Sequence, residues 1–162
     1  MKKQLVIGIS GFKNSGKTTL ISNIIPKIKE IDCILKVATI KHDGHDFAPD
    51  VRGTDTYIHR KSGADAVAIF SNSKYMVIKD ESVDVPKILE FYKDMDIVLL
   101  EGFKSSKYQK IEILRDGISE EPYCNNVLAY VSDFYMDREK VTFDLEDYEK
   151  IGKFIVKMYN EL

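Results

Sequence analysis

Cysteine is scarce in this chain of 162 residues, which contains only Cys33 and Cys124. Two cysteines are too few for a disulfide framework or a cysteine zinc site, and they favour a reducing compartment. Long apolar runs are lacking too, because none approaches the ~20 residues of a membrane-spanning helix. The N-terminus shows no signal-peptide pattern. We therefore expect a cytoplasmic protein with no membrane partner.

An excess of positive charge is also absent. The 24 lysines and arginines are balanced by 26 aspartates and glutamates, for a net charge of −2. No global basic field attracts nucleic acid, so we expect no nucleic-acid partner. Repeats and low-complexity tracts are missing, and 44% of the residues are hydrophobic. This composition predicts one globular domain over residues 1–162.

The most informative stretch is residues 11–18, Gly-Phe-Lys-Asn-Ser-Gly-Lys-Thr. Its spacing, G-x-x-x-x-G-K-[ST], is that of a phosphate-binding loop. An apolar run leads into it and a helix-compatible run follows, which is the context that the motif requires. Backbone N–H groups and the helix dipole would face the phosphates. Lys17 would reach the β and γ phosphates, and the Thr18 hydroxyl would bind Mg²⁺. We assign nucleotide binding to Gly11, Asn14, Ser15, Gly16, Lys17, Thr18 and Thr19.

Hydrophobic periodicity predicts strands that alternate with helices. Strands are expected at residues 4–10, 34–40, 64–70, 75–78, 96–102, 111–114, 127–131 and, more weakly, 141–143. Helices are expected from Thr18, over 54–62, over 85–92, and from Leu145 onward. Pro26 should kink the first helix or end it early. The strands 64–70 and 75–78 form a hairpin, an antiparallel edge on an otherwise parallel sheet. The pattern predicts a three-layer α/β P-loop NTPase fold.

Glu101 ends the second strong apolar strand. In a parallel sheet it would emerge at the same edge as the phosphate loop. An acid there can hold Mg²⁺ or orient an attacking water, although it could also merely end a strand. We favour the functional reading. Lys17 and Glu101 are then the catalytic residues, and Thr18 and Glu101 the metal ligands.

A polar block follows the strand 34–40, at the same expected edge. Lys41, His42, Asp43, His45 and Asp46 lie almost contiguously there. His42, Asp43, His45 and Asp46 are four possible ligands so close together on one loop, with no obvious distant ligand, that a closed zinc site is the poorer interpretation. A loop that senses phosphate and Mg²⁺ is the better interpretation, with lysine and histidines as donors and an aspartate for the metal. Spacing does not decide which aspartate.

Three further assignments have two alternatives each. Thr54 or Asp55 would cap the helix over 54–62. Arg60, near its end, is either a partner of the helix dipole or an anion contact. Asp133 follows the strand 127–131 and could read guanine through its N1 and N2 donors, but a turn residue is the favoured interpretation.

Together these blocks resemble the MobB family of molybdopterin-guanine dinucleotide biosynthesis adaptor proteins. The resemblance covers about residues 5–65 and 96–104. It rests on Gly11-x4-Gly16-Lys17-Thr18, Ile40-Lys41-His42, His45-Asp46-Phe47, Asp50, Gly53-x-Asp55-Thr56, Arg60, Gly63-Ala64 and Asp96-x4-Glu101-Gly102-Phe103-Lys104.

The resemblance implies a GTP- and Mg²⁺-binding protein with weak GTPase activity at most. It would assist the guanylyltransferase that joins GMP to molybdopterin, it would form a homodimer, and molybdopterin could be a further bound ligand. On this analogy Lys17 and Thr18 contact phosphate and Mg²⁺, and Glu101 is the second acidic motif. Lys41, His42, His45 and Asp46 line the site, and Asp55 and Arg60 join the cofactor-binding residues.

Two alternatives stay open. A small-molecule or nucleotide kinase using ATP shares the loop but needs positive charge over the transferred phosphoryl group, and this chain has only four arginines. A nucleotide-dependent switch overlaps with the adaptor reading. No Asn/Thr-Lys-x-Asp guanine motif is present, so GTP over ATP rests on the resemblance alone.

Overall fold

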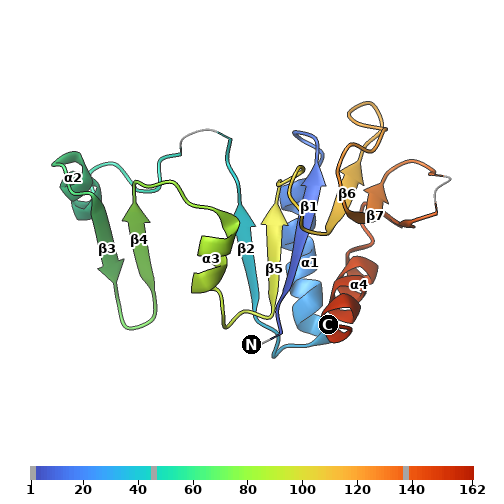
Figure 1. Ribbon diagram of the computed structural model, residues 1–162, viewed down its shortest axis with the longest axis horizontal. Coiled ribbons are helices and arrows are strands. Elements are labelled where there is room, and N and C mark those ends of the chain that lie inside the picture. Colours follow the sequence, from blue (N-terminus) through green and yellow to red (C-terminus); the bar gives the residue numbers. More distant parts are fainter. Residues whose placement is uncertain (1–2, 45–46, 137–138) are drawn as a thin grey trace. The chain divides into compact units, whose positions relative to one another are not determined.

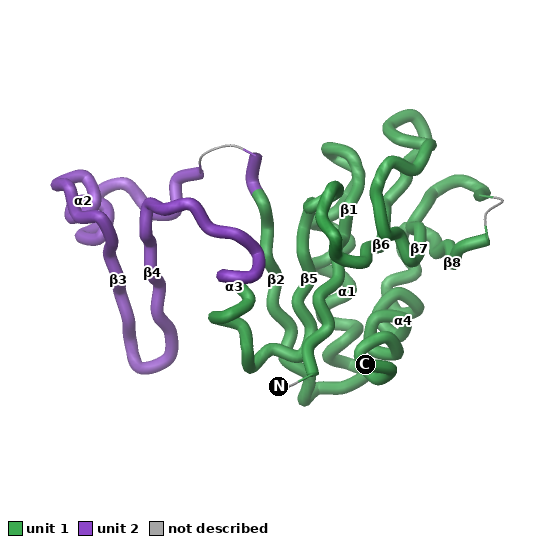
Figure 2. The backbone as a smooth tube through the Cα atoms, viewed as in Figure 1, with its two compact units in different colours: residues 1–42, 89–162 green, residues 43–88 purple. Residues whose placement is uncertain are grey.

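The computed structural model describes residues 3–44, 47–136 and 139–162. The chain divides into two compact units, Met1–His42 with Leu89–Leu162 and Asp43–Ile88 (Figure 2). The expectation of one domain over the whole chain stays a prediction. No helix in the described part of the chain combines the length and the apolar character needed to cross a membrane.

The first unit is built on a six-stranded sheet in the order β2-β5-β1-β6-β7-β8, with every neighbouring pair parallel (Figure 1). Parallel strands bring their carboxyl ends to one edge, where ligands bind in folds of this kind. The strands are β1 (Leu5–Gly11), β2 (Val37–Lys41), β5 (Ile97–Glu101), β6 (Lys110–Leu114), β7 (Val127–Ser132) and β8 (Val141–Asp144).

Two helices, α1 (Lys17–Ile31) and α4 (Tyr148–Asn160), cover the same face of this sheet (Figure 1). Each carries apolar residues at helical spacing and buries that stripe against alternate residues of the strands. The main core forms there, from Leu20, Ile21, Ile24, Ile28, Ile151, Ile155 and Val156 of the helices with Ile7, Ile9, Ile97, Leu99, Ile111, Ile113, Ala129 and Val131 of the strands.

Two outcomes were predicted for Pro26: an early end of the first helix was wrong, and a kink stays a prediction. The helix continues through Pro26 to Ile31. Proline removes one main-chain hydrogen bond, but the next turn places Ile28 in the core with no exposed surface. Burial of a large aliphatic side chain is worth about 1.5–3 kcal/mol, which offsets much of the cost of the missing bond.

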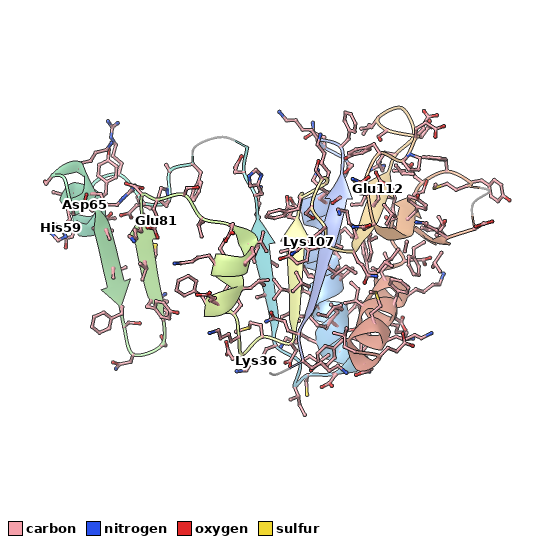
Figure 3. The ribbon with its side chains drawn as sticks, in the orientation of Figure 1. Lys36, His59, Asp65, Glu81, Lys107 and Glu112 are labelled. Carbon is pink, nitrogen blue, oxygen red and sulfur yellow. The ribbon has the colours of Figure 1, made fainter. Side chains whose placement is uncertain are left out.

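The opposite face of β6 is covered by loops. Lys110 has no exposed surface, and its ammonium donates to the carbonyl oxygens of Ser106 and Tyr108, both at 2.7 Å. Glu112, also fully buried (Figure 3), accepts hydrogen bonds at 3.1 Å from the amides of Tyr123 and Cys124. These two side chains tie residues 106–108 and 123–124 to the sheet.

The second unit contains the helix α2 (Asp55–Lys61) and the strands β3 (Ala66–Phe70) and β4 (Tyr75–Lys79). The two strands pair antiparallel, as predicted, but they form their own two-stranded sheet and not an edge of the six-stranded one. The helix α3 (Val85–Phe91), predicted over 85–92, begins in this unit and ends in the first.

Two predicted boundaries need correction. The strand expected over 34–40 begins at Val37, because Ile34 is 84% exposed and the Lys36 amide donates to the Asp96 carboxylate at 2.7 Å, outside the strand ladder. The last helix begins at Tyr148 and not at Leu145. Leu145 instead lies in the turn after β8, where the amide of Asp147 donates to the carbonyl of Asp144.

Candidate functional site

The predicted phosphate loop joins β1 to α1 and depends on two glycines. A Cβ on Gly11 would lie 2.5 Å from Ser15 Oγ and 3.0 Å from the carbonyl oxygen of Ile113, so no larger residue fits. Gly16 has φ +95°, a left-handed conformation that glycine adopts without strain. It begins α1 without any side-chain cap. The first amides of the helix are therefore left for an anion.

Lys17 folds back over the loop. Its ammonium donates to the carbonyl oxygens of Gly11 at 3.0 Å and Phe12 at 2.6 Å. Burial lowers the pKa of Lys17, and the nearby Glu101 carboxylate opposes that shift. The position predicted for the β- and γ-phosphate contact thus holds a partly desolvated cation, which binds a phosphate more strongly than a fully hydrated one does.

Three polar side chains meet beside the loop. The Thr18 hydroxyl donates to Glu101 Oε1 at 3.0 Å, and Lys41 Nζ lies 3.8 Å from the same oxygen. Parallel pairing places Glu101 between two neighbours. Its register partners are Lys41 on β2 and Ile9 on β1, the strand that leads into the loop. A hydroxyl and a carboxylate oxygen beside a phosphate site match the few protein ligands that Mg²⁺ takes, the rest being phosphate and water. The residues present therefore fit the predicted cation.

The block after β2 is only partly described. The amide of His42 donates to the Glu101 carbonyl at 3.4 Å. The centroid of the His42 ring lies 5.4 Å from that of the Phe103 ring. His45 and Asp46 lie outside the described residues, so their predicted roles stay predictions. Among the side chains that the structure does describe, no three His, Cys, Asp or Glu residues gather closely enough to hold a metal ion.

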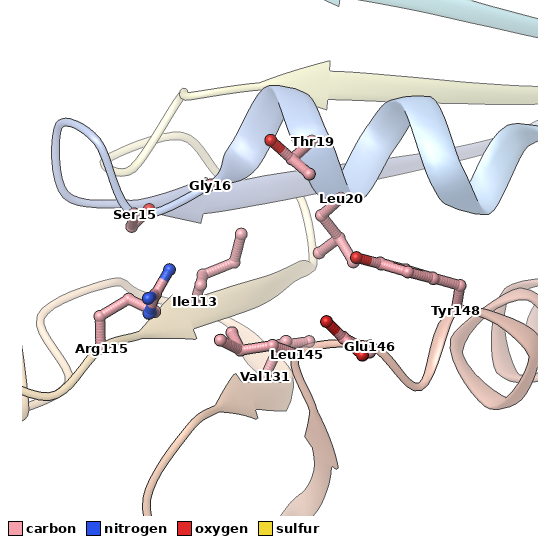
Figure 4. Close-up of a pocket in the computed structure, with 10 residues that line it drawn as sticks. All are labelled: Ser15, Gly16, Thr19, Leu20, Ile113, Arg115, Val131, Leu145, Glu146 and Tyr148. Atoms are coloured by element: carbon pink, nitrogen blue, oxygen red, sulfur yellow. The ribbon is translucent and has the colours of Figure 1, made fainter.

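A cavity of 160 Å³ opens beside the loop at the ends of β6 and β7 (Figure 4). Its rim carries Arg115, whose NH1 atom would lie 3.8 Å from a Cβ on Gly16. Ser15, also in its wall, has a buried hydroxyl for which the described residues offer no hydrogen-bond partner. The cavity is lined by Ser15, Gly16, Thr19, Leu20, Ile113, Arg115, Val131, Leu145, Glu146 and Tyr148.

Asp133 holds Arg115 in place. One carboxylate oxygen accepts from Arg115 Nε at 2.7 Å, and the other accepts from the Asp116 amide at 2.9 Å. Burial raises the pKa of Asp133, but these hydrogen bonds outweigh that effect and lower the pKa below its ordinary value. Since both oxygens are engaged, the structure favours the turn interpretation of Asp133 over that of a base reader.

The remaining predicted residues lie in the second unit. Thr54 is the N-cap of α2 and accepts from the Tyr57 amide, so the predicted cap is confirmed. Asp55 occupies the first turn of α2. Arg60, in the last turn, donates from NH2 to both carboxylate oxygens of Asp80 at 2.8 and 2.9 Å. The predicted roles of Asp55 in cofactor binding and of Arg60 as an anion contact stay predictions.

Comparison with known proteins adds the family. A model described as molybdopterin guanine dinucleotide synthesis protein B, MobB, matches residues 6–133. The chain belongs to this family. The Escherichia coli molybdopterin-guanine dinucleotide biosynthesis adapter protein is 27% identical over 164 residues, covering 94% of this chain and 91% of that protein. A Methanocaldococcus jannaschii protein named "Putative molybdopterin-guanine dinucleotide biosynthesis adapter protein" is 33% identical over 135 residues, covering 80% of this chain and 55% of that protein.

Solved MobB structures share the fold. One described as molybdopterin-guanine biosynthesis protein B has a TM-score of 0.72 at 29% identity, over 95% of this chain and 99% of that one. Bacillus subtilis MobB has a TM-score of 0.75 at 25% identity, over 94% and 96%. The predicted P-loop NTPase fold and the predicted family are thereby confirmed.

Sequence reasoning missed two features of this site. Arg115 was counted only as one of the few arginines. Its position directly after β6 could have indicated that it lies at the same edge of the sheet as the phosphate loop. Glu146 was not considered, because it follows the weakest of the predicted strands and carries no motif.

Proposed function

We propose that the protein binds GTP with Mg²⁺ at the phosphate loop and acts as an adaptor in the formation of molybdopterin guanine dinucleotide. One observation carries the nucleotide part of the proposal. Lys17, Thr18, Lys41 and Glu101 converge at the carboxyl edge of the sheet, beside a loop whose glycines leave the amides of α1 uncapped. The role in the cofactor pathway rests on the names of the relatives in the MobB family.

The charges suit a polyphosphate. Lys17 and Lys41 both lie near the Glu101 carboxylate, and Lys17 now bonds to neutral carbonyl oxygens. A phosphate oxygen carries negative charge, so it attracts the Lys17 ammonium more strongly than a neutral carbonyl oxygen does. The Lys17 ammonium would therefore exchange its carbonyl partners for phosphate oxygens, while Glu101 and the Thr18 hydroxyl hold Mg²⁺.

Hydrolysis would be slow. Fast phosphoryl transfer uses an arginine against the charge of the transition state, yet Arg60 and Arg115 already pair with Asp80 and Asp133. We infer a weak GTPase at most, in keeping with a protein that presents a nucleotide to a partner.

The second unit supports the proposal of a homodimer. The β3–β4 hairpin buries little of its apolar surface: Phe70 is 82% exposed, Tyr75 76% and Val77 61%. A two-stranded sheet is marginal alone, and contiguous apolar surface of this kind marks protein interfaces. A second copy of the chain would cover it.

Reconstituted synthesis tests the adaptor role. Molybdopterin, GTP, Mg²⁺ and the guanylyltransferase partner are combined with wild-type protein, with Lys17→Ala, or with Lys13→Ala, which removes an exposed lysine from the same loop. The proposal predicts that the wild type and Lys13→Ala raise the yield of the dinucleotide and that Lys17→Ala does not. Equal yields with and without the wild-type protein would contradict it.

A further inference from the structure

The cavity beside the phosphate loop lies where the non-phosphate end of a bound nucleotide would extend. In the sheet, β6, β7 and β8 follow β1 in order and in parallel. Their carboxyl ends therefore continue the edge on which the phosphate loop sits. Ser15, Gly16 and Thr19 of the loop and of α1 form one wall of the cavity, so a ligand held by the loop reaches it without leaving the protein surface.

The cavity suits a flat, partly polar group. Leu20, Leu145 and Tyr148 supply apolar surface, while Arg115 and Glu146 supply charge (Figure 4). A neighbouring cavity of 440 Å³ shares Leu145 and Glu146 with it and extends to the turn after β8. Mostly apolar walls with a few polar groups are characteristic of small-molecule sites of about 300–1,000 Å³.

The acidic side chains nearby differ in availability. Both oxygens of Asp133 are engaged by Arg115 and the Asp116 amide. Asp147 accepts at one oxygen, Oδ2, from Lys150 at 2.9 Å and from the Asp144 amide at 3.3 Å. Asp144 and Asp147 line the neighbouring cavity and not the smaller one. Glu146 is the one acid in the wall of the smaller cavity, and no described residue forms a hydrogen bond or ion pair with its carboxylate. Within the smaller cavity, Glu146 therefore supplies the carboxylate that can accept from a ligand.

We propose that Glu146 selects guanine as the base of the bound nucleotide. This inference rests on the proposed function. A carboxylate has acceptors only, and the edge of guanine presents two adjacent donors, N1–H and the 2-amino group. Adenine presents an acceptor at N1 and no 2-amino group, so its edge faces the carboxylate with like polarity. A site built to bond a donor strongly rejects an analogue that lacks it.

Four triphosphates test the assignment on the full-length wild type and on Glu146→Gln, by calorimetry with Mg²⁺. The glutamine amide accepts at one atom and donates at the other, which matches xanthine, with N1–H and a carbonyl at C2. GTP should therefore bind Glu146→Gln about ten- to a hundredfold more weakly than it binds the wild type. Xanthosine triphosphate should bind Glu146→Gln more tightly than the wild type. The wild type should bind inosine triphosphate, which lacks the 2-amino group, more weakly than GTP, and ATP more weakly still.

Glu149→Gln is the matched control, because Glu149 pairs with Lys153 on the exposed side of α4 and lies in neither cavity. It should leave all four affinities unchanged. The switch towards xanthosine triphosphate separates a base contact from general damage to the fold. Wild-type binding of GTP with an unchanged preference in Glu146→Gln would overturn the role of Glu146 and leave the proposed function standing. Failure of the wild type to bind any of the four nucleotides would overturn both.

Discussion

Gly11→Ala should damage both the fold and the phosphate loop. The added Cβ would lie 2.5 Å from Ser15 Oγ, 3.0 Å from the Ile113 carbonyl oxygen and 3.2 Å from Ile113 Cβ. The last two neighbours belong to β6 in the centre of the sheet and move little. Overpacking of this kind costs about 1–3 kcal/mol of unfolding free energy, which lowers the melting temperature by about 2–12 °C in a chain of this size.

Thermal unfolding followed by circular dichroism measures the effect, with Gly44→Ala as the control. A Cβ on Gly44 meets nothing within 4 Å, so that variant should stay within about 0.5 kcal/mol of the wild type. Adding Ser15→Ala to Gly11→Ala removes the closest contact only and should restore part of the loss. If Gly11→Ala has the same melting temperature as the wild type, the close packing of the loop against β6 is refuted.

Three other predictions concern separate parts of the molecule. Burial and a hydrogen bond to Glu112 raise the pKa of the Cys124 thiol to about 12, so only ~10⁻⁴ of this thiol is ionised at pH 8. A thiol reagent should therefore modify one site per folded chain, the exposed Cys33. Rapid reaction of two sites would contradict this. Asp96→Ala should lower the free energy of unfolding, measured by urea denaturation, by about 1–3 kcal/mol. The substitution removes the acceptor of the Lys36 amide and the Tyr159 hydroxyl, which donate to Asp96 at 2.7 and 3.0 Å. An unchanged midpoint would be inconsistent with those bonds. Phe70→Asp should convert a dimer to a monomer in sedimentation analysis. Phe91→Asp, at an exposed position outside the hairpin, should not. A wild-type monomer at micromolar concentrations would refute the interface.

The parallel sheet and the meeting of its edge residues could be predicted from the sequence. Continuous apolar runs ended by Lys41 and Glu101 mark buried parallel strands. Parallel pairing then brings those two side chains together, and Glu101 accepts from Thr18. The phosphate-loop motif fixed the starting point of α1. These features follow from local patterns, which is why a single sequence was enough.

Features decided by tertiary packing could not be predicted. The charged positions of Lys110 and Glu112 alternate with apolar ones and suggest a solvent-facing side of β6, yet loops distant in sequence bury both. Pro26 stays helical because the turn after it packs in the core. Local propensity gives way wherever contacts between remote segments contribute more energy.

The Arg115–Asp133 pair illustrates the same limit at the site. The two residues are 18 positions apart in the chain, and each directly follows one of two neighbouring strands. They meet at 2.7 Å because β6 and β7 are in parallel register. The sequence offered Asp133 as a base reader or a turn residue. Its two engaged oxygens became visible only in the folded chain.

Nucleotide binding at the loop is the central claim, and calorimetry with Mg²⁺ tests it most directly. GTP and ATP are titrated onto the wild type and onto Lys17→Ala. The account predicts that the wild type binds GTP in preference to ATP, and that Lys17→Ala binds GTP at least about tenfold more weakly, since a hydrogen bond to a charged group is worth ~1.5–3 kcal/mol. Equal GTP affinity in the two proteins, or no binding to the wild type, would contradict it.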